Sequence, residues 1–435
     1  MNWFDLTLKL KGFPIEGAKS ELQKIQDIPE AEYANYIELK KKEIVSYHLQ
    51  HNSFYKNLLG NKPIDKWEDL PILTKKDLQQ PLKDRLSEGF TLKNVYINKT
   101  SGSSGHPFVF AKDKFSHALT WSVIFNRFGW FGLDFNSSYQ ARFYGIPLDK
   151  IGYYKERLKD KLATRYRFPI FNLSDDKLET FLAEFYTKKF DYINGYTSSI
   201  ELFAKYLQNK NIVLKEVCST LKVCIVTSEM LFPETKKLLE KQLGVPVVNE
   251  YGASELDLIA FQNKQDKWVL NSETLFVEVV DENNKVLPYG REGKLIVTSL
   301  FNKAHPFIRY ELGDVGVISE KSSAKHQILQ KLTGRTNDVA TLPSGKVVPG
   351  LTFYYVTKSI IEDSGDVKEF VIKQTKPNTF VVTYVSSEKI SDLKKRDMIN
   401  AIEKYLEKGL ELQLNRVDVL ERKKSGKLKQ FESLV

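Results

Sequence analysis

Apolar and polar positions follow helical spacing in the first part of the chain. Residues 1–90 have a polar, charged background in which this spacing predicts helices. Residues 116–131 repeat apolar and aromatic positions in the same way, so another helix is expected there. Two more helical patterns lie within residues 174–209, around Gly195 and Tyr196.

From residue 221 the pattern alternates between strands and a helix. Leu221–Val226 is expected to be a short buried strand, and Val245–Val248 a second strand. Between them, Pro233–Gly244 reads as a helix with proline at its start and glycine at its end. This strand–helix–strand unit predicts parallel strands with ligand-binding loops at the strand ends.

The later part of the chain has two further patterns. Residues 268–320 predict strands divided by turns, and the segment after Gly334 predicts a smaller α+β module. Its expected elements are a hairpin over 339–349, a helix over 353–363, strands at 369–372 and 379–384, a helix over 391–408 and a strand at 415–420. We therefore expect an α/β fold with a large N-terminal domain over residues 1–335 and a small C-terminal domain over residues 338–435.

Composition narrows the class of protein. The 435 residues, of which 42% are hydrophobic, suffice for about two or three domains with large cores. Two cysteines, Cys218 and Cys224, exclude a disulfide scaffold or a Cys-rich metal site and fit a reducing compartment. No targeting segment or charge-free spanning stretch is visible, which predicts a soluble, cytoplasmic protein without a membrane span.

The charge of the chain permits an anionic ligand. Its 65 basic and 55 acidic residues give a net charge of +10, spread along the sequence. Such a field favours either nucleic acid or an anionic cofactor. A nucleic-acid-binding protein should gather basic and aromatic residues on one face, and the dispersed charges argue against that partner.

The first candidate motif is a loop of small residues between two expected strands, Tyr96–Ile97 and Phe108–Phe110. Its glycines let backbone N–H groups point outward and its hydroxyls add donors, which suits polyphosphate oxygens. A plain hairpin turn is the alternative. The candidate residues are Thr100, Ser101, Gly102, Ser103, Ser104 and Gly105.

The second motif follows the predicted strand at Val245–Val248. Tyr251 followed by glycine can lie against a purine base, and Glu255 can hold a metal ion beside phosphates. A strand-to-helix cap that uses Ser254 is the alternative.

Three further segments each contain a charged residue that could contact a ligand. Asp314 follows a glycine in an expected tight turn and could accept both hydroxyls of a ribose, or be an ordinary turn residue. Arg335 lies where the domain character changes and could contact a ligand beside a hinge, or belong to a polar linker. Lys427 follows Ser425 and Gly426 and could reach developing negative charge, or belong to a basic tail.

In this order and spacing, the five segments resemble the motifs of the adenylate-forming (acyl-CoA synthetase) superfamily. Three other segments, Val226–Leu231, Asn302–Tyr310 and Arg422–Lys429, are similar to the phenylacetate-CoA ligase-like family. Within that family they most resemble the capsular polysaccharide biosynthesis branch.

The resemblance implies a two-step ligase that uses ATP and Mg²⁺. A carboxylic acid attacks the α-phosphate, which gives an acyl-adenylate and pyrophosphate, and an acceptor then displaces AMP. The thiol of CoA is the leading acceptor, which would make the chain an acyl- or aryl-CoA ligase. The alternative acceptor is an amine, such as an amino sugar in surface polysaccharide biosynthesis. The partners would be small molecules, and an oligomer is compatible with the resemblance.

The resemblance also assigns roles to residues. Thr100 to Gly105 would hold the β- and γ-phosphates, and Ser228 and Glu229 would neighbour the adenine edge. Tyr251, Gly252 and Ala253 would pack on adenine or line the acyl site, and Ser254 would belong to the cofactor-binding site beside them. Glu255 would hold Mg²⁺, Asp314 would bind the ribose, and Arg335 would contact the ribose or phosphate. Lys427 would act during adenylation only. The small domain would then swing about Asn337, where relatives usually carry Asp or Lys, and withdraw Lys427.

The sequence says least about which carboxylic acid would be the substrate. Aromatic residues could line an acyl pocket, although an aromatic stripe at helical spacing is more often core. These residues are Trp121, Phe125, Phe128, Trp130, Tyr144 and Tyr196. Arg142 could pair with an acidic substrate or lie on the surface.

Overall fold

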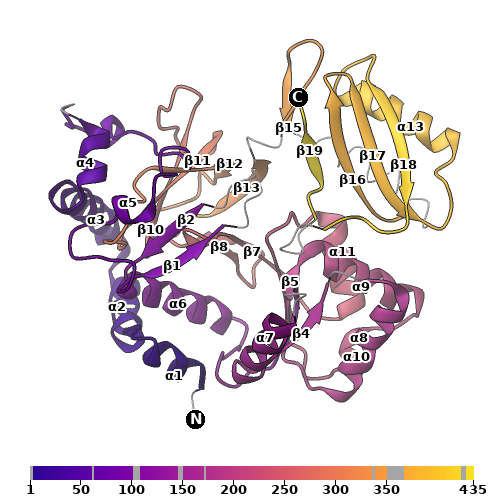
Figure 1. The fold of residues 1–435 in the computed structure, drawn as a ribbon, viewed down its shortest axis with the longest axis horizontal. Coiled ribbons are helices and arrows are strands. Elements are labelled where there is room, and N and C mark those ends of the chain that lie inside the picture. Colours follow the sequence, from indigo (N-terminus) through magenta and orange to yellow (C-terminus); the bar gives the residue numbers. More distant parts are fainter. Residues whose placement is uncertain are drawn as a thin grey trace.

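The molecule is built from two large sheets with helices around them and a third sheet formed by the C-terminal residues (Figure 1). The computed structural model describes residues 3–60, 63–100, 108–145, 150–170, 173–335, 339–349, 367–422 and 428–435. The expected mixed α/β fold is confirmed. Among the helices of these ranges, none has the length and apolar character needed to cross a membrane.

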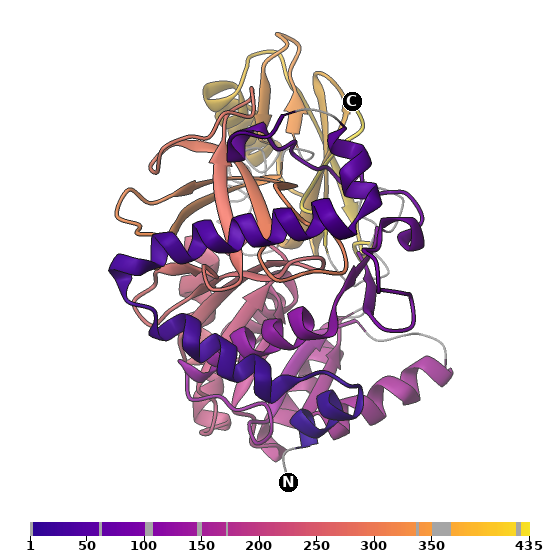
Figure 2. The same cartoon turned by 90° about the vertical axis from the view of Figure 1, so that its left-hand side faces the viewer.

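Helices fill most of the first 85 residues, as predicted. The longest, α3 (Glu30–His51), lies across the second sheet (Figure 2) and is fixed there by the Tyr33 hydroxyl, which donates to the Ser272 carbonyl at 3.2 Å. The others are α1 (Trp3–Leu10), α2 (Ile15–Asp27), α4 (Ser53–Leu59), the short η1 (Trp67–Asp69) and α5 (Leu82–Arg85).

The first sheet has seven strands in the order β4-β3-β5-β6-β7-β8-β9. The strands from β4 to β7 are parallel, and β8 and β9 are antiparallel to their neighbours. The predicted parallel pair is confirmed as β6 and β7, joined by α11. The bounds are β3 (Gln140–Tyr144), β4 (Arg165–Pro169), β5 (Tyr192–Tyr196), β6 (Val223–Thr227), β7 (Val247–Ala253), β8 (Asp257–Gln262), β9 (Trp268–Leu270) and α11 (Pro233–Leu243).

Helices cover both faces of this sheet. Alternate residues of β6 point to opposite faces, so Cys224 and Val226 pack with α8 and α9, whereas Val223 and Ile225 pack with α2 and α6. Of the aromatic residues considered for an acyl pocket, those from Trp121 to Trp130 lie in the second of these cores, where the Trp121 ring lies 5.0 Å from that of Phe4. Tyr144 and Tyr196 belong to the first core. The helices are α6 (Lys114–Gly129), α7 (Lys150–Leu162), α8 (Asp175–Thr187), α9 (Thr197–Asn209) and α10 (Leu214–Val217).

The predicted helices around Gly195 are confirmed as α8 and α9, but Gly195 itself lies in a central strand. All five residues of β5 are buried, so the strand has no alternation of apolar and polar residues. A Cβ atom on Gly195 would lie 2.5 Å from the Phe143 side chain. Glycine therefore permits the close approach of β3 and β5.

The second sheet is antiparallel, in the order β10-β11-β12-β13. The predicted strands in residues 268–320 are confirmed, but the tight turn expected at Asp314 is wrong because Asp314 lies inside β12. Gly313 has a φ of 82°, and the pairing of β11 with β12 shifts register beside it. The glycine therefore marks a β-bulge. The bounds are β10 (Leu275–Val280), β11 (Glu292–Ser299), β12 (Tyr310–Ile318) and β13 (Leu329–Arg335).

The C-terminal residues form the expected α+β unit. Its four strands have the order β18-β17-β16-β19, and Figure 1 shows this sheet beside α9 and α11. Residues 336–338, where we expect the domain boundary, and the helix expected over 353–363 lie outside the described residues. The bounds are β14 (Val339–Thr341), β15 (Val347–Pro349), β16 (Val367–Lys376), β17 (Thr379–Ser386), α13 (Asp392–Tyr405), β18 (Glu411–Val417) and β19 (Phe431–Ser433).

Candidate nucleotide site

Two hydrogen bonds join the end of β7 and the turn that follows it to strand β12. The Tyr251 hydroxyl donates to Oδ2 of Asp314 at 2.7 Å, and the Tyr310 hydroxyl donates to Oε1 of Glu255 at 2.9 Å. All four side chains are buried. Since Tyr310 and Asp314 share β12, the two bonds place both candidate carboxylates along one strand.

The turn between β7 and β8 needs glycine at its entrance. β7 continues through Ala253, and β8 returns antiparallel to it, so the alternative of a helix capped by Ser254 is wrong. A Cβ atom on Gly252 would lie 2.3 Å from the Asp257 carbonyl oxygen. The close approach of the two strands thus depends on glycine.

Replacing Gly252 with alanine is expected to destabilise the protein by about 1–3 kcal/mol, since the backbone must shift to relieve the clash. The shift would also displace Tyr251 and Glu255 from their partners on β12. Urea denaturation would measure the loss. Gly129→Ala is the matched control, because nothing lies within 4 Å of the Cβ position at Gly129; equal stability of the two variants would contradict the expectation.

Arg335 lies opposite Asp314. It ends β13, and the two residues are register partners across β12 and β13. Directly opposed residues on antiparallel strands have neighbouring Cβ atoms. Asp314, expected to bind the ribose, and Arg335, expected to contact the ribose or phosphate, are therefore adjacent in the backbone pairing.

The loop expected to hold phosphates is anchored at its base. The loop lies between two strands, as predicted, and these strands, β1 (Tyr96–Lys99) and β2 (Val109–Lys112), pair antiparallel. The Thr100 N–H donates to the Phe108 carbonyl at 2.9 Å, and the Phe108 N–H donates to the Thr100 hydroxyl at 3.1 Å. The other expected residues lie outside the described residues: Ser101, Gly102, Ser103, Ser104, Gly105, and with them Asn337 and Lys427.

Ser228 and Glu229 follow the carboxyl end of β6. Ser228 is exposed and has a left-handed φ of 70°, the kind of backbone strain that clusters at functional sites. Glu229 is engaged on both oxygens, which accept from the N–H groups of Ser198 at 2.7 Å and Leu428 at 3.0 Å. Burial raises the pKa of Glu229. Its carboxylate therefore links β6 to the residue that follows Lys427.

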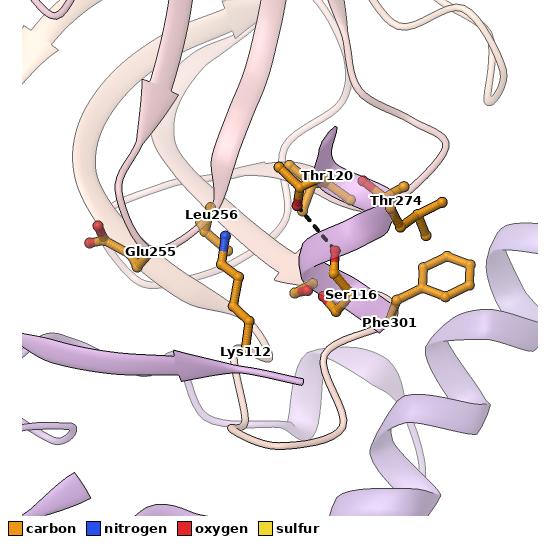
Figure 3. Close-up of a pocket in the computed structure, with 10 residues that line it drawn as sticks. Lys112, Ser116, Thr120, Glu255, Leu256, Thr274 and Phe301 are labelled. Atoms are coloured by element: carbon orange, nitrogen blue, oxygen red, sulfur yellow. Dashed lines mark hydrogen bonds between the residues drawn. The ribbon is translucent and has the colours of Figure 1, made fainter. Parts of the chain in front are cut away.

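Sequence reasoning missed a buried lysine beside the site. The Lys112 ammonium pairs with Asp257, and its side chain extends from β2 toward the turn that carries Glu255 and Leu256 (Figure 3). Burial lowers the pKa of Lys112 to about 7, while the carboxylates of Glu255 and Asp113 act in the opposite direction. The available signal was a lysine that ends the apolar run Phe108–Ala111. Lys75 is a second missed cation, with Nζ 3.6 Å from Oε1 of Glu255.

An aromatic and charged cluster lies at the carboxyl ends of β3 and β5. The rings of Tyr144 and Tyr196 are 4.7 Å apart, and the Arg142 guanidinium lies 3.9 Å from the centre of the Tyr144 ring. Arg142 is partly buried, and its Nε has no hydrogen-bond partner among the described residues. Burial also raises the pKa of Glu250, which accepts from the Thr227 hydroxyl at 3.1 Å. The cluster combines aromatic surface with both signs of charge.

The donor set fits a metal that arrives with a nucleotide. In the described ranges no three His, Cys, Asp or Glu side chains gather as a metal site. Mg²⁺ commonly takes one or two carboxylates and completes its shell with phosphate oxygens and water. Glu255 supplies one carboxylate of that kind.

The sequence matches known ligases over a limited segment. No family model matches the chain. A phenylacetate-coenzyme A ligase of Aromatoleum evansii is 28% identical over 136 residues, which cover 30% of this chain and 31% of that protein. The Thermus thermophilus enzyme of the same name is 27% identical over 139 residues, again 30% of this chain and 31% of the relative. The match thus spans about a third of the length of these curated relatives.

The fold is that of the AMP-forming ligases. The structure of 2-hydroxyisobutyryl-CoA ligase in its postadenylation state, in complex with 2-HIB-AMP, matches with a TM-score of 0.71 and 17% identity over 93% of this chain and 90% of that one. The same enzyme in its thioesterification state gives 0.58 over 93% and 91%. The amide bond synthetase McbA from Marinactinospora thermotolerans gives 0.53 at 15% identity over 79% and 69%.

Proposed function

We propose that the chain activates a carboxylic acid with ATP, releases pyrophosphate and transfers the acyl group to the thiol of CoA. The observation that carries this proposal is the double link of Tyr251 to Asp314 and of Glu255 to Tyr310, with Arg335 opposite Asp314. It brings together three separate segments whose residues suit ribose, metal and phosphate. The short matches to phenylacetate-coenzyme A ligases support the same chemistry.

Each residue has a physical task in this proposal. Asp314, oriented by the Tyr251 hydroxyl, accepts hydrogen bonds from the ribose hydroxyls. Glu255, oriented by the Tyr310 hydroxyl, offers a carboxylate to Mg²⁺, which neutralises phosphate charge when bound. Thr100 to Gly105 offer N–H and hydroxyl donors to the phosphates, and Arg335 adds a cation beside the ribose.

Replacing Tyr310 with phenylalanine is expected to raise the Mg²⁺ concentration needed for activity by about tenfold. A group that orients a metal ligand typically contributes 10- to 100-fold to metal affinity. Mg²⁺ titrations of pyrophosphate release would measure the shift. Tyr186→Phe is the control, since Tyr186 is exposed on α8, and an unchanged Mg²⁺ dependence in Tyr310→Phe would remove the orienting role.

Transfer to an amine is the second candidate. The likeness to the amide bond synthetase supports it, because the same fold serves an amide-forming enzyme. The proposal then places the chain in surface polysaccharide assembly, with an amino sugar as acceptor, as the resemblance to the capsular branch suggests.

Acid-dependent release of pyrophosphate from MgATP tests both candidates. A panel of aryl, short-chain and amino acids should be assayed alone, with CoA and with amino sugars, and Asp314→Ala should serve as the inactive control. Release for one acid class supports adenylation, and consumption of CoA or of the amine identifies the acceptor. ATP binding without release for any acid would contradict the proposed activity.

A further inference from the structure

Helix α7 exposes an apolar stripe. Ile151 is 84% exposed, Tyr154 71%, Leu158 59% and Leu162 49%. Their spacing of three, four and four residues puts them on one helix face. Soluble proteins seldom leave such a row of large apolar side chains uncovered, so this face suits a partner.

The lysines of α7 lie on either side of the apolar stripe. At about 100° per residue, Lys155 and Lys159 flank one side of the stripe and Lys161 flanks the other. All three lysines are exposed. The stripe is therefore bordered by cations on both sides.

The acidic residues of α7 are paired with arginines of β4. Arg165 Nε donates to Asp160 at 2.5 Å, and Arg167 donates to Asp160 at 2.9 Å and to Glu156 at 3.0 Å. Asp160 is 2% exposed, and Glu156 also contacts Lys159. The negative charges thus lie against the body, and the outer face is apolar and basic.

The helix is placed where a flat surface could reach it. Figure 2 shows α7 at the edge of the molecule, with one end extending beyond the sheets. An open hollow beside it is lined by Tyr154, Arg157, Lys161 and Arg165 among others. The hollow adds further cationic groups next to the stripe.

We propose that this face of α7 docks on an anionic lipid surface, with the helix lying in the plane of the headgroups. The apolar stripe would enter the boundary between headgroups and acyl chains, and the lysines would meet lipid phosphates. Charge complementarity selects this occupant over a second copy of the chain, whose own lysines would oppose these. With 13 residues, α7 is too short to span the bilayer.

Vesicle co-sedimentation tests the proposal on the full chain. Binding to phosphatidylcholine vesicles that contain about 30% phosphatidylglycerol should exceed binding to phosphatidylcholine alone by about tenfold, and should weaken with salt. Ile151→Asp with Leu158→Asp should lower it by about tenfold. Lys155→Glu with Lys161→Glu should do the same without removing apolar surface.

Leu393→Asp is the matched control, because Leu393 is 68% exposed on α13, far along the chain from α7. Its binding should equal that of the unaltered chain, and thermal unfolding should show that all variants are folded. Equal binding to both vesicle types would overturn the proposal, and so would vesicle binding that the α7 variants leave unchanged. A third contrary outcome is that the chain does not bind vesicles but self-associates or binds polyglutamate, and that the α7 variants abolish this association.

Discussion

Replacing Lys427 with alanine is expected to reduce acyl-adenylate formation by about 10²- to 10³-fold, the typical loss when one group that stabilises transition-state charge is removed. In the proposed reaction this lysine meets the charge that develops between the carboxylate and the α-phosphate. ATP affinity should stay unchanged, because the interaction belongs to the transition state. Transfer from preformed acyl-adenylate to the acceptor should also be unchanged, because the expected swing of the C-terminal domain would withdraw the lysine in that step.

The measurement separates the two half-reactions. Pyrophosphate release reports adenylation, and consumption of added acyl-adenylate reports transfer. Lys429→Ala is the control, since Lys429 lies two positions away and contacts Glu432 at 3.7 Å. Equal pyrophosphate release by both variants would remove the role assigned to Lys427.

Glu229 provides a companion test of how this lysine is positioned. Its carboxylate accepts from the Leu428 N–H, and Leu428 directly follows Lys427. Arg422 strengthens the same junction, because it donates to the Ser198 hydroxyl at 3.2 Å and pairs with Glu369 at 2.7 Å. Glu229→Gln should therefore lower adenylation and leave transfer unchanged.

The parts of the fold that could be predicted have a local signal. The amphipathic N-terminal helices have apolar residues at helical spacing, and the β6–α11–β7 unit has short apolar runs on either side of a helix that begins at proline and is followed by glycine. The loop at Thr100 is marked by small residues between two apolar segments. β5 is as fully buried as β6, but Asn194 and Gly195 interrupt its apolar residues, so it lacks the continuous apolar run that marks β6. Gly313 is expected to form a tight turn, but the structure has a β-bulge there. A glycine with a positive φ occurs in a bulge as well as in a turn, so the residue type alone does not distinguish them.

In the candidate site, too, only features with a local sequence signal could be predicted. Glu255, Asp314 and Arg335 could be proposed from motif spacing, because the chemistry of each motif depends on residue type, whereas Lys112 and Lys75 belong to no motif. The partners of these side chains could not be proposed: the Tyr310 hydroxyl on Glu255 and the Lys112 ammonium on Asp257 arise from strands far apart in the sequence. Such pairs depend on how separate sheets pack against one another, which no local sequence pattern indicates.

Acidification is expected to destabilise the protein steeply between about pH 6.5 and pH 4, because three histidines are buried in the neutral state. Burial lowers the pKa of His48 to about 4 and that of His117 to about 3, and burial together with the Arg85 charge holds the pKa of His305 well below its usual range. His48 donates from Nε2 to the Asn302 carbonyl at 3.0 Å. His305 accepts from Arg85, so a proton on that nitrogen would face a cation.

The sign of the effect follows from proton uptake. Below about pH 6.5 the unfolded chain binds protons at these histidines and the folded chain does not, so the free energy of unfolding falls as pH falls. Each such histidine contributes about 1.4 kcal/mol per pH unit in this window. Urea denaturation of the unaltered chain and of His48→Gln at about pH 7, 6 and 5 measures this contribution, since glutamine keeps a donor for Asn302 without the titration. The variant should lose less stability on acidification, whereas His326→Gln, at an exposed histidine, should follow the unaltered chain. Identical pH dependence in all three proteins would show that His48 does not titrate on unfolding.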